Sequence, residues 1–130
     1  MDDHRGTPRK HLFVVNSSPD FLRIARELFE EEGYSVATDE FVPTVFARIV
    51  MRHPAALIID LAPEDPAPWE LLEQLHAEAE TTDIPILVTS TSPQLLDQAQ
   101  AGYRTDHSYL TKPMDLDALV TAVREMIETP

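Results

Sequence analysis

Five short apolar runs alternate with amphipathic stretches along the chain, and this alternation limits the possible folds more than any other feature. Each run predicts a strand, and two of them, Leu12–Val15 and Ala55–Ile59, are apolar enough to be buried on both faces. The runs are Leu12–Val15, Tyr34–Thr38, Ala55–Ile59, Ile84–Thr89 and Ser108–Thr111. Strands that alternate with helices through short connections form parallel sheets covered on both faces. The sequence therefore predicts an α/β fold, with a five-stranded parallel sheet and helices on both of its faces.

Local signals mark where the predicted helices begin and end. Ser18-Pro19 and Ser92-Pro93 each join an N-cap serine to a proline at the first helical position, where a missing N–H is tolerated. Gly33 can adopt the left-handed conformation that follows many helices, so we expect the first helix to end there. We expect Pro43 to open the second helix and Asp115 to cap the last one.

Charge and cysteine content exclude several classes of function. The net charge is −13, which repels nucleic-acid phosphates and anionic lipid. The chain has no cysteine, so disulfides and thiol chemistry are excluded. No apolar stretch approaches the roughly 18–20 residues that span a bilayer. We expect a soluble, cytoplasmic protein that binds neither nucleic acid nor membrane directly, with a polar segment at residues 1–10 and one domain at residues 11–130.

Polar residues follow the predicted strands where each one ends. They are Asn16, Ser17, Asp60, Ser90 and Lys112. In parallel α/β sheets, ligands and chemistry lie beyond the carboxyl ends of the strands. A carboxylate held at such an end can act as a nucleophile, and a lysine ammonium nearby can hold a phosphate as a point charge. These residues are therefore the candidate site.

Four segments that carry these residues resemble the receiver domain of bacterial response regulators. Its first strand and loop are matched by HLFVVNSSPD, its third strand by PAALIIDL, its fourth by IPILVTS, and its fifth strand and last helix by YLTKPMDLDAL. The resemblance extends from about residue 11 to residue 128. It implies a flavodoxin-like (βα)5 receiver fold, and a signalling role in a two-component phosphorelay instead of an enzymatic one.

The resemblance also implies a role for single residues. Asp60 matches the aspartate that accepts the phosphoryl group, and Lys112 matches the lysine that contacts the phosphoryl oxygens. Ser90 matches the hydroxyl residue that contacts the same group, and its spacing favours it over the threonines on either side. Tyr109 matches the aromatic residue that moves inward on activation.

The partners that the resemblance implies are proteins. A histidine kinase or phosphotransfer protein would supply the phosphoryl group. A downstream protein would dock on the face formed by the last two helices and the fifth strand, and the same face could support a homodimer.

One part of the family pattern is missing from this sequence. Receivers normally carry two acidic residues in the first loop, and these hold Mg²⁺, whereas this chain has Asn16 and Ser17. Mg²⁺ prefers carboxylate oxygens. Asp60 would be its only carboxylate ligand, helped by the backbone carbonyl of Ala62. We therefore expect weak Mg²⁺ binding, and an Asp60–Lys112 pair that forms without metal.

Two alternatives remain open at this point. One is a pseudo-receiver, which docks to proteins without being phosphorylated. The other is an α/β domain that binds an anion or small molecule against Lys112, because fold alone does not determine function.

Overall fold

The computed structural model describes residues 10–102, 108–112 and 115–128, with the side chain of residue 128 left out. The helices and strands alternate along the chain as β1 His11–Val15, α1 Pro19–Glu31, β2 Ser35–Asp39, α2 Val45–Arg52, β3 Ala56–Leu61, α3 Ala67–Ala77, β4 Ile86–Ser90, α4 Pro93–Gly102, β5 Ser108–Thr111 and α5 Leu116–Glu128. The strands form one sheet in the order β2-β1-β3-β4-β5, and all neighbouring pairs are parallel. The predicted fold class is confirmed.

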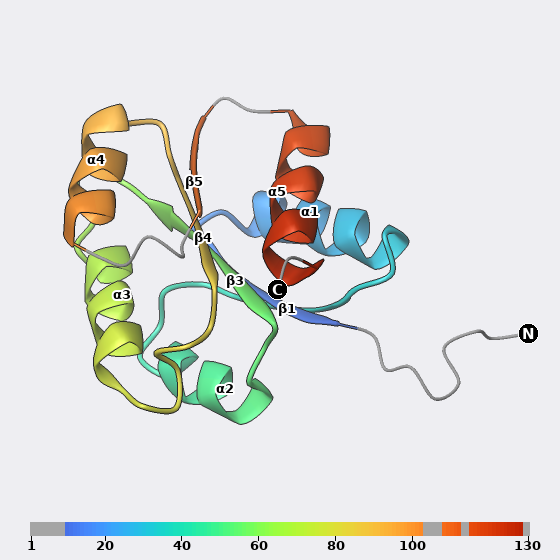
Figure 1. Cartoon of the computed structure of the whole chain (residues 1–130), viewed down its shortest axis with the longest axis horizontal. Coiled ribbons are helices and arrows are strands. Elements are labelled where there is room, and N and C mark those ends of the chain that lie inside the picture. The colour runs from blue at the N-terminus through green and yellow to red at the C-terminus, as the bar shows by residue number, and fades with distance from the viewer. Residues whose placement is uncertain (1–9, 103–107, 113–114, 129–130) are drawn as a thin grey trace, which may run out of the picture.

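The sheet lies between two helical layers (Figure 1), with α1 and α5 on one face and α2, α3 and α4 on the other. Because side chains alternate along each strand, every central strand contributes to both layers. The layer beneath α1 and α5 contains Leu12, Val14, Ile58 and Leu87. The opposite layer contains Phe13, Val15, Ile59 and Val88. Each fully buried side chain of this kind contributes about 1.5–3 kcal/mol, so the position of the central strands is strongly determined.

Three of the capping predictions are confirmed by hydrogen bonds. The side chains of Ser18, Ser92 and Asp115 each accept from the backbone N–H three residues later, at 3.2, 3.3 and 2.7 Å respectively. Such a bond satisfies a backbone donor that the helix leaves unpaired. Gly33 follows α1 with φ of +98°, a conformation that glycine adopts without strain.

Several predicted boundaries are wrong by one or two residues, including those of β2 and β4, which were predicted at Tyr34–Thr38 and Ile84–Thr89. Two other shifts have a clear physical reason. The helix α2 begins at Val45 and not at Pro43, because the N–H of Val45 donates to the carbonyl of Val42 at 3.0 Å and closes a turn around the proline. The strand β3 continues past the predicted end at Ile59, because the next two residues still pair with β4. Asp60 is therefore the penultimate residue of a strand and is held by the sheet itself.

Two predictions are only partly tested by the fold. No helix in the described part of the chain is long and apolar enough to cross a membrane. The predicted polar segment at residues 1–10 lies outside the described residues, apart from Lys10.

Candidate functional site

The register of the sheet brings Asp60 to the same edge as two residues from other strands. Asp60 pairs with Thr89 of β4. Paired residues of neighbouring parallel strands point to the same face, so both side chains emerge on the face that α1 and α5 cover. Lys112 directly follows β5, and its backbone N–H donates to the carbonyl of Ser90 at 2.7 Å. This bond extends the ladder by one residue and directs the lysine toward Asp60.

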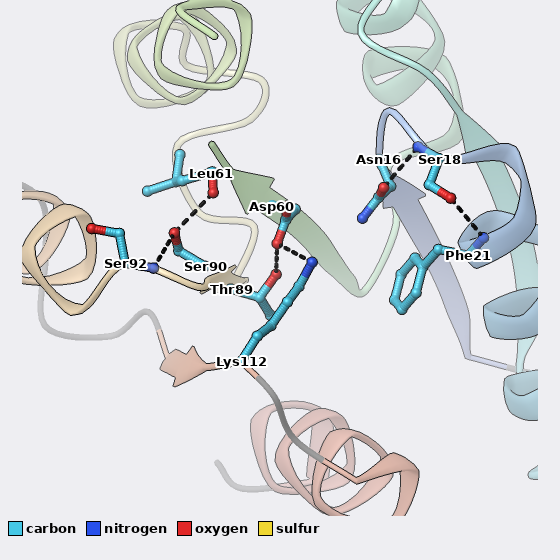
Figure 2. A network of polar contacts seen from close by, with 9 residues as sticks. All are labelled: Asn16, Ser18, Phe21, Asp60, Leu61, Thr89, Ser90, Ser92 and Lys112. Carbon is cyan, nitrogen blue, oxygen red and sulfur yellow. Dashed lines mark hydrogen bonds and ion pairs between the residues drawn. The ribbon is translucent and has the colours of Figure 1, made fainter. Parts of the chain in front are cut away.

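One carboxylate oxygen receives both contacts (Figure 2). Oδ1 of Asp60 accepts a hydrogen bond from Oγ1 of Thr89 at 2.6 Å and lies 2.8 Å from Nζ of Lys112. Among the described residues, no hydrogen bond or ion pair reaches Oδ2. The Asp60 side chain is 19% exposed and that of Lys112 is 28% exposed, so the pair is screened only partly from water and still open to a ligand.

An aromatic ring from α1 gives the lysine a second contact. Nζ of Lys112 lies 5.7 Å from the centroid of the Phe21 ring, which is within the range of a cation–π interaction. The ammonium therefore lies between a carboxylate and the negative face of a ring. Both contacts hold it beside Asp60 at the carboxyl edge of the sheet.

The structure corrects the preference for Ser90. This residue is fully buried, and its register partner is Leu61, whose side chain belongs to the opposite layer of the core. Oγ of Ser90 donates to the carbonyl of Leu61 at 2.8 Å and accepts from the N–H of Ser92 at 3.1 Å. The hydroxyl beside Asp60 belongs to Thr89, because only alternate residues of a strand share a face.

Tyr109 is also separated from Asp60 by the sheet. It pairs with Val88 and packs against the core layer beneath α2, α3 and α4. Its side chain is half-buried. The proposed switch residue is thus within the structure but does not contact the carboxylate.

The described side chains of the first loop form no hydrogen bond to Asp60, and that of Asn16 bonds within the loop. Asn16 is 5% exposed, and its Oδ1 accepts from the N–H of Ser18 at 2.9 Å. Ser17 is exposed. The nearest acid in the sequence, Asp20, is 89% exposed and pairs with Arg23 at 3.6 Å on the surface of α1. Among the described residues, none of these groups forms a hydrogen bond or an ion pair with Asp60.

These donors do not fit an ordinary Mg²⁺ site, which takes one or two carboxylates in near-octahedral geometry. Within the described ranges, no cluster of three or more His, Cys, Asp or Glu residues could hold a metal ion. The carbonyl of Ala62 already accepts from the N–H of Asp65 at 3.3 Å. The carboxylate that ends β2, Asp39, is bound to Arg48 at 2.6 Å. Asp60 is left as the one strand-end carboxylate in this part of the chain that faces the site.

The sequence analysis missed one residue of the site, Phe21, and ranked Thr89 behind Ser90. The apolar run that contains Thr89 has no visible alternation, because its strand is buried on both faces. The available signal was the alternation of side chains along the strand. Thr89 lies two residues after Leu87 and so points to the same face, which is also the face of Asp60. Phe21 carried no signal, because an aromatic residue on an amphipathic helix is usually part of the core.

The fold and this edge define a class of signalling domain, a (βα)5 unit with a carboxylate and a lysine at the carboxyl ends of its strands. The family model of the response regulator receiver domain matches residues 12–124. The chain belongs to this family, which works in two-component phosphorelay signalling and is not a catalytic family. Receiver domains interact with histidine kinases or phosphotransfer proteins and with downstream effectors, and they commonly bind Mg²⁺ for phosphorylation.

Individual proteins show the same relationship. Protein PilH of Pseudomonas aeruginosa is 23% identical over 89% of this chain and 96% of its own length. The transcriptional regulatory protein GlrR of Escherichia coli K12 is 28% identical over 91% of this chain, but the match covers 26% of GlrR. The chemotaxis protein CheY4 of Vibrio cholerae superposes with a TM-score of 0.78 at 17% identity, covering 91% of this chain and 98% of CheY4. This likeness shows the fold.

Proposed function

We propose that this chain is an atypical receiver that accepts a phosphoryl group on Asp60 and signals by docking to another protein. The observation that carries the proposal is the ion pair of 2.8 Å between Asp60 and Lys112 at the open edge of the sheet. A part-exposed carboxylate at a strand end is accessible to a donor, and the ammonium beside it can neutralise the charge that arrives with the phosphoryl group.

The transfer follows from these groups. A carboxylate oxygen of Asp60 attacks the phosphorus of a phosphohistidine on a histidine kinase or phosphotransfer protein. The new O–P bond forms as the P–N bond breaks, and the donor imidazole leaves with the electron pair and takes a proton from water. Nζ of Lys112 is 2.8 Å from the carboxylate and stabilises the phosphoryl oxygens by direct charge attraction.

Metal dependence is where we expect this receiver to differ from its family. Asp60 has its negative charge balanced by Lys112, and the side-chain oxygen of Asn16 is engaged within its own loop. Mg²⁺ would have to compete with the ammonium for a single carboxylate. We therefore expect weak Mg²⁺ binding, with Asp60 and the carbonyl of Ala62 as its protein ligands, and slow phosphorylation.

The output face that we propose consists of α4, β5 and α5. β5 is an edge strand of the sheet, next to β4. Lys112 directly follows β5 and joins it to the site through the bond of its N–H to the carbonyl of Ser90. A change at Asp60 that moved Lys112 would therefore act first on this strand. The same face is the proposed surface for a downstream protein or for a homodimer.

A second candidate is a pseudo-receiver that docks without phosphorylation. It is favoured by one observation, which is that Oδ1 of Asp60 is already satisfied by both Lys112 and Thr89. A site that is balanced in this way has no electrostatic need of a ligand.

Intact-mass measurement after incubation with phosphoramidate, with Mg²⁺ or with EDTA, separates the two. We expect one added phosphoryl group in the wild type and none in Asp60→Asn. Label with Mg²⁺ and little with EDTA would show that the altered loop still uses metal. A wild type that stays unlabelled, under conditions that label an ordinary receiver, would favour the pseudo-receiver or an anion-binding domain.

A further inference from the structure

We propose that Phe21 is a positioning residue for phosphoryl transfer, and that its ring holds the ammonium of Lys112 beside Asp60. This inference rests on the proposed function, in which that ammonium stabilises the incoming phosphoryl oxygens. It gives the first turn of α1 a part in the site, in addition to its place in the core.

The ring and the ammonium lie together at the carboxyl edge of the sheet (Figure 2). Nζ of Lys112 is 5.7 Å from the centroid of the Phe21 ring and 2.8 Å from Oδ1 of Asp60. A cation within about 6 Å of a ring centroid is attracted by the negative face of the ring. The Lys112 side chain is 28% exposed, so water screens this attraction only in part. The ammonium therefore has two side-chain contacts, one with a charge and one with a neutral ring.

The position of the ring is set by the start of α1. Phe21 is the third residue of this helix, and its N–H donates to Oγ of the N-cap residue Ser18 at 3.2 Å. The side chain of Phe21 is half-buried and packs against the core layer beneath α1 and α5. A capped backbone and a packed side chain leave the ring few orientations. The ring is thus a fixed contact for a flexible partner.

Lys112 needs such a contact because its ammonium is a point charge on a flexible stem. The contact with Asp60 changes during the reaction, since one oxygen of this carboxylate forms the bond to phosphorus. The ring of Phe21 takes no part in the reaction, and its face has the same charge distribution before and after the transfer. It can therefore keep the ammonium at the site while negative charge arrives on the phosphoryl oxygens, which lowers the cost of orienting the two groups.

The first loop offers the ammonium no substitute for this contact. Within the described ranges, Nζ of Lys112 forms an ion pair with Asp60 alone. Asn16 and Ser17 carry no charge at the positions where receivers normally have two acids. Phe21 is thus the described side chain, besides Asp60, that holds the ammonium at this edge.

Rates of labelling by phosphoramidate test the role. Phe21→Leu keeps an apolar side chain but removes the ring, and we expect labelling roughly two- to fivefold slower, as for the loss of a part-exposed cation–π contact. Phe21→Tyr keeps the ring and should label close to the wild-type rate. The matched control is Phe46→Leu, because Phe46 is a half-buried ring packed against the opposite core layer. Its rate should equal that of the wild type.

Equal rates in Phe21→Leu and a labelled wild type would overturn the proposal, as would an equally large loss in Phe46→Leu. If Phe21→Leu folds poorly, Phe21→Met serves as a second ring-free variant. A double variant separates positioning from lost packing. Phe21→Leu should slow labelling no further in a Lys112→Met background, because the ring acts through the ammonium. Further slowing in that background would contradict this.

The contact can also be measured without a phosphoryl donor. Lys10 and Lys112 are the two lysines of the chain, so isotope-labelled lysine gives two sets of side-chain signals in an NMR spectrum. The ring current of Phe21 should move the Cε proton signals of Lys112 upfield from those of Lys10, and Phe21→Leu should abolish this shift. The same shift in both proteins would refute the contact. An upfield shift in a wild type that stays unlabelled would confirm the contact but contradict both the positioning role and the proposed function.

Discussion

The two halves of the sheet's carboxyl edge differ in what their polar residues contact. On the side of β3, β4 and β5, Asp60 is bound by Thr89 and Lys112 at 2.6 and 2.8 Å. On the side of β1, Asn16 bonds within its own loop and Ser17 is exposed. Three clustered carboxylates would repel one another and require a divalent cation, whereas one carboxylate is balanced by one ammonium. The carboxylate at this edge therefore obtains its charge balance from a side chain.

The largest expected effect concerns Lys112, on the side of the edge formed by β3, β4 and β5. Lys112→Met should slow labelling of Asp60 by roughly 100-fold, because it removes the positive charge that we propose stabilises the incoming phosphoryl oxygens. The measurement is intact mass against time with phosphoramidate. The matched control is Lys10→Met, since Lys10 is the other lysine of the chain and precedes β1 at the opposite edge of the sheet. Similar rates in Lys112→Met and its control would show that the ammonium of Lys112 does not assist the transfer.

The next largest effect concerns the loop after β1, where the acidic residues of the family are replaced. Asn16→Asp with Ser17→Asp returns two carboxylates to the first loop and should strengthen Mg²⁺ binding by roughly tenfold or more. An aspartate at position 16 can still accept from the N–H of Ser18, so the loop should keep its shape. Isothermal titration with Mg²⁺ measures the change, and Ser17→Asn is the uncharged control. Unchanged affinity would mean that the lost acids do not explain weak metal binding.

A smaller effect concerns the stability that the buried hydroxyl of Ser90 supplies at the end of β4. Ser90→Ala should lower the free energy of unfolding by about 1–2 kcal/mol, because it leaves the buried carbonyl of Leu61 without its donor. Thr91→Ala, at an exposed neighbour, should change it little. Urea unfolding gives both values. Equal free energies of unfolding in the two variants would mean that the buried hydrogen bond of Ser90 does not stabilise the end of β4.

The smallest effect concerns the opposite edge and depends on pH. Burial first, and then the charge of Arg52, lower the pKa of His11 below 6.5, and its Nε2 is buried with no hydrogen-bond partner among the described residues. The unfolded chain therefore binds a proton that the folded chain resists. The stability due to neutral His11 is full above pH 6.5 and is lost as the pH falls through the lower folded pKa.

His11→Gln should therefore flatten the fall of unfolding free energy below pH 6.5. Urea titrations at a series of pH values measure it. His53→Asn is the control, because His53 is exposed and has φ of 43°, which asparagine tolerates. An equally flat profile in the control would show that the acid sensitivity does not come from His11.

Much of the fold could be predicted because its signals are local. The apolar runs gave the five strands, and the serine and aspartate caps at Ser18, Ser92 and Asp115 gave three helix starts. The predicted start of the second helix at Pro43 was wrong, because proline suits a turn as well as a first helical turn. The division into residues 1–10 and 11–130 stays a prediction, as do the roles of Asp60, Lys112 and Tyr109.

The sequence is enough to predict the parallel sheet and the placement of Asp60 and Lys112 at one edge, since strand ends in a parallel sheet share that edge. Which hydroxyl bonds to the carboxylate depends on tertiary packing. Alternation within a strand is local, but the offset between β3 and β4 depends on packing in both layers at once. That offset pairs Asp60 with Thr89 and Leu61 with Ser90. A shift by one residue would exchange the two hydroxyls, because neighbouring residues of a strand point to opposite faces.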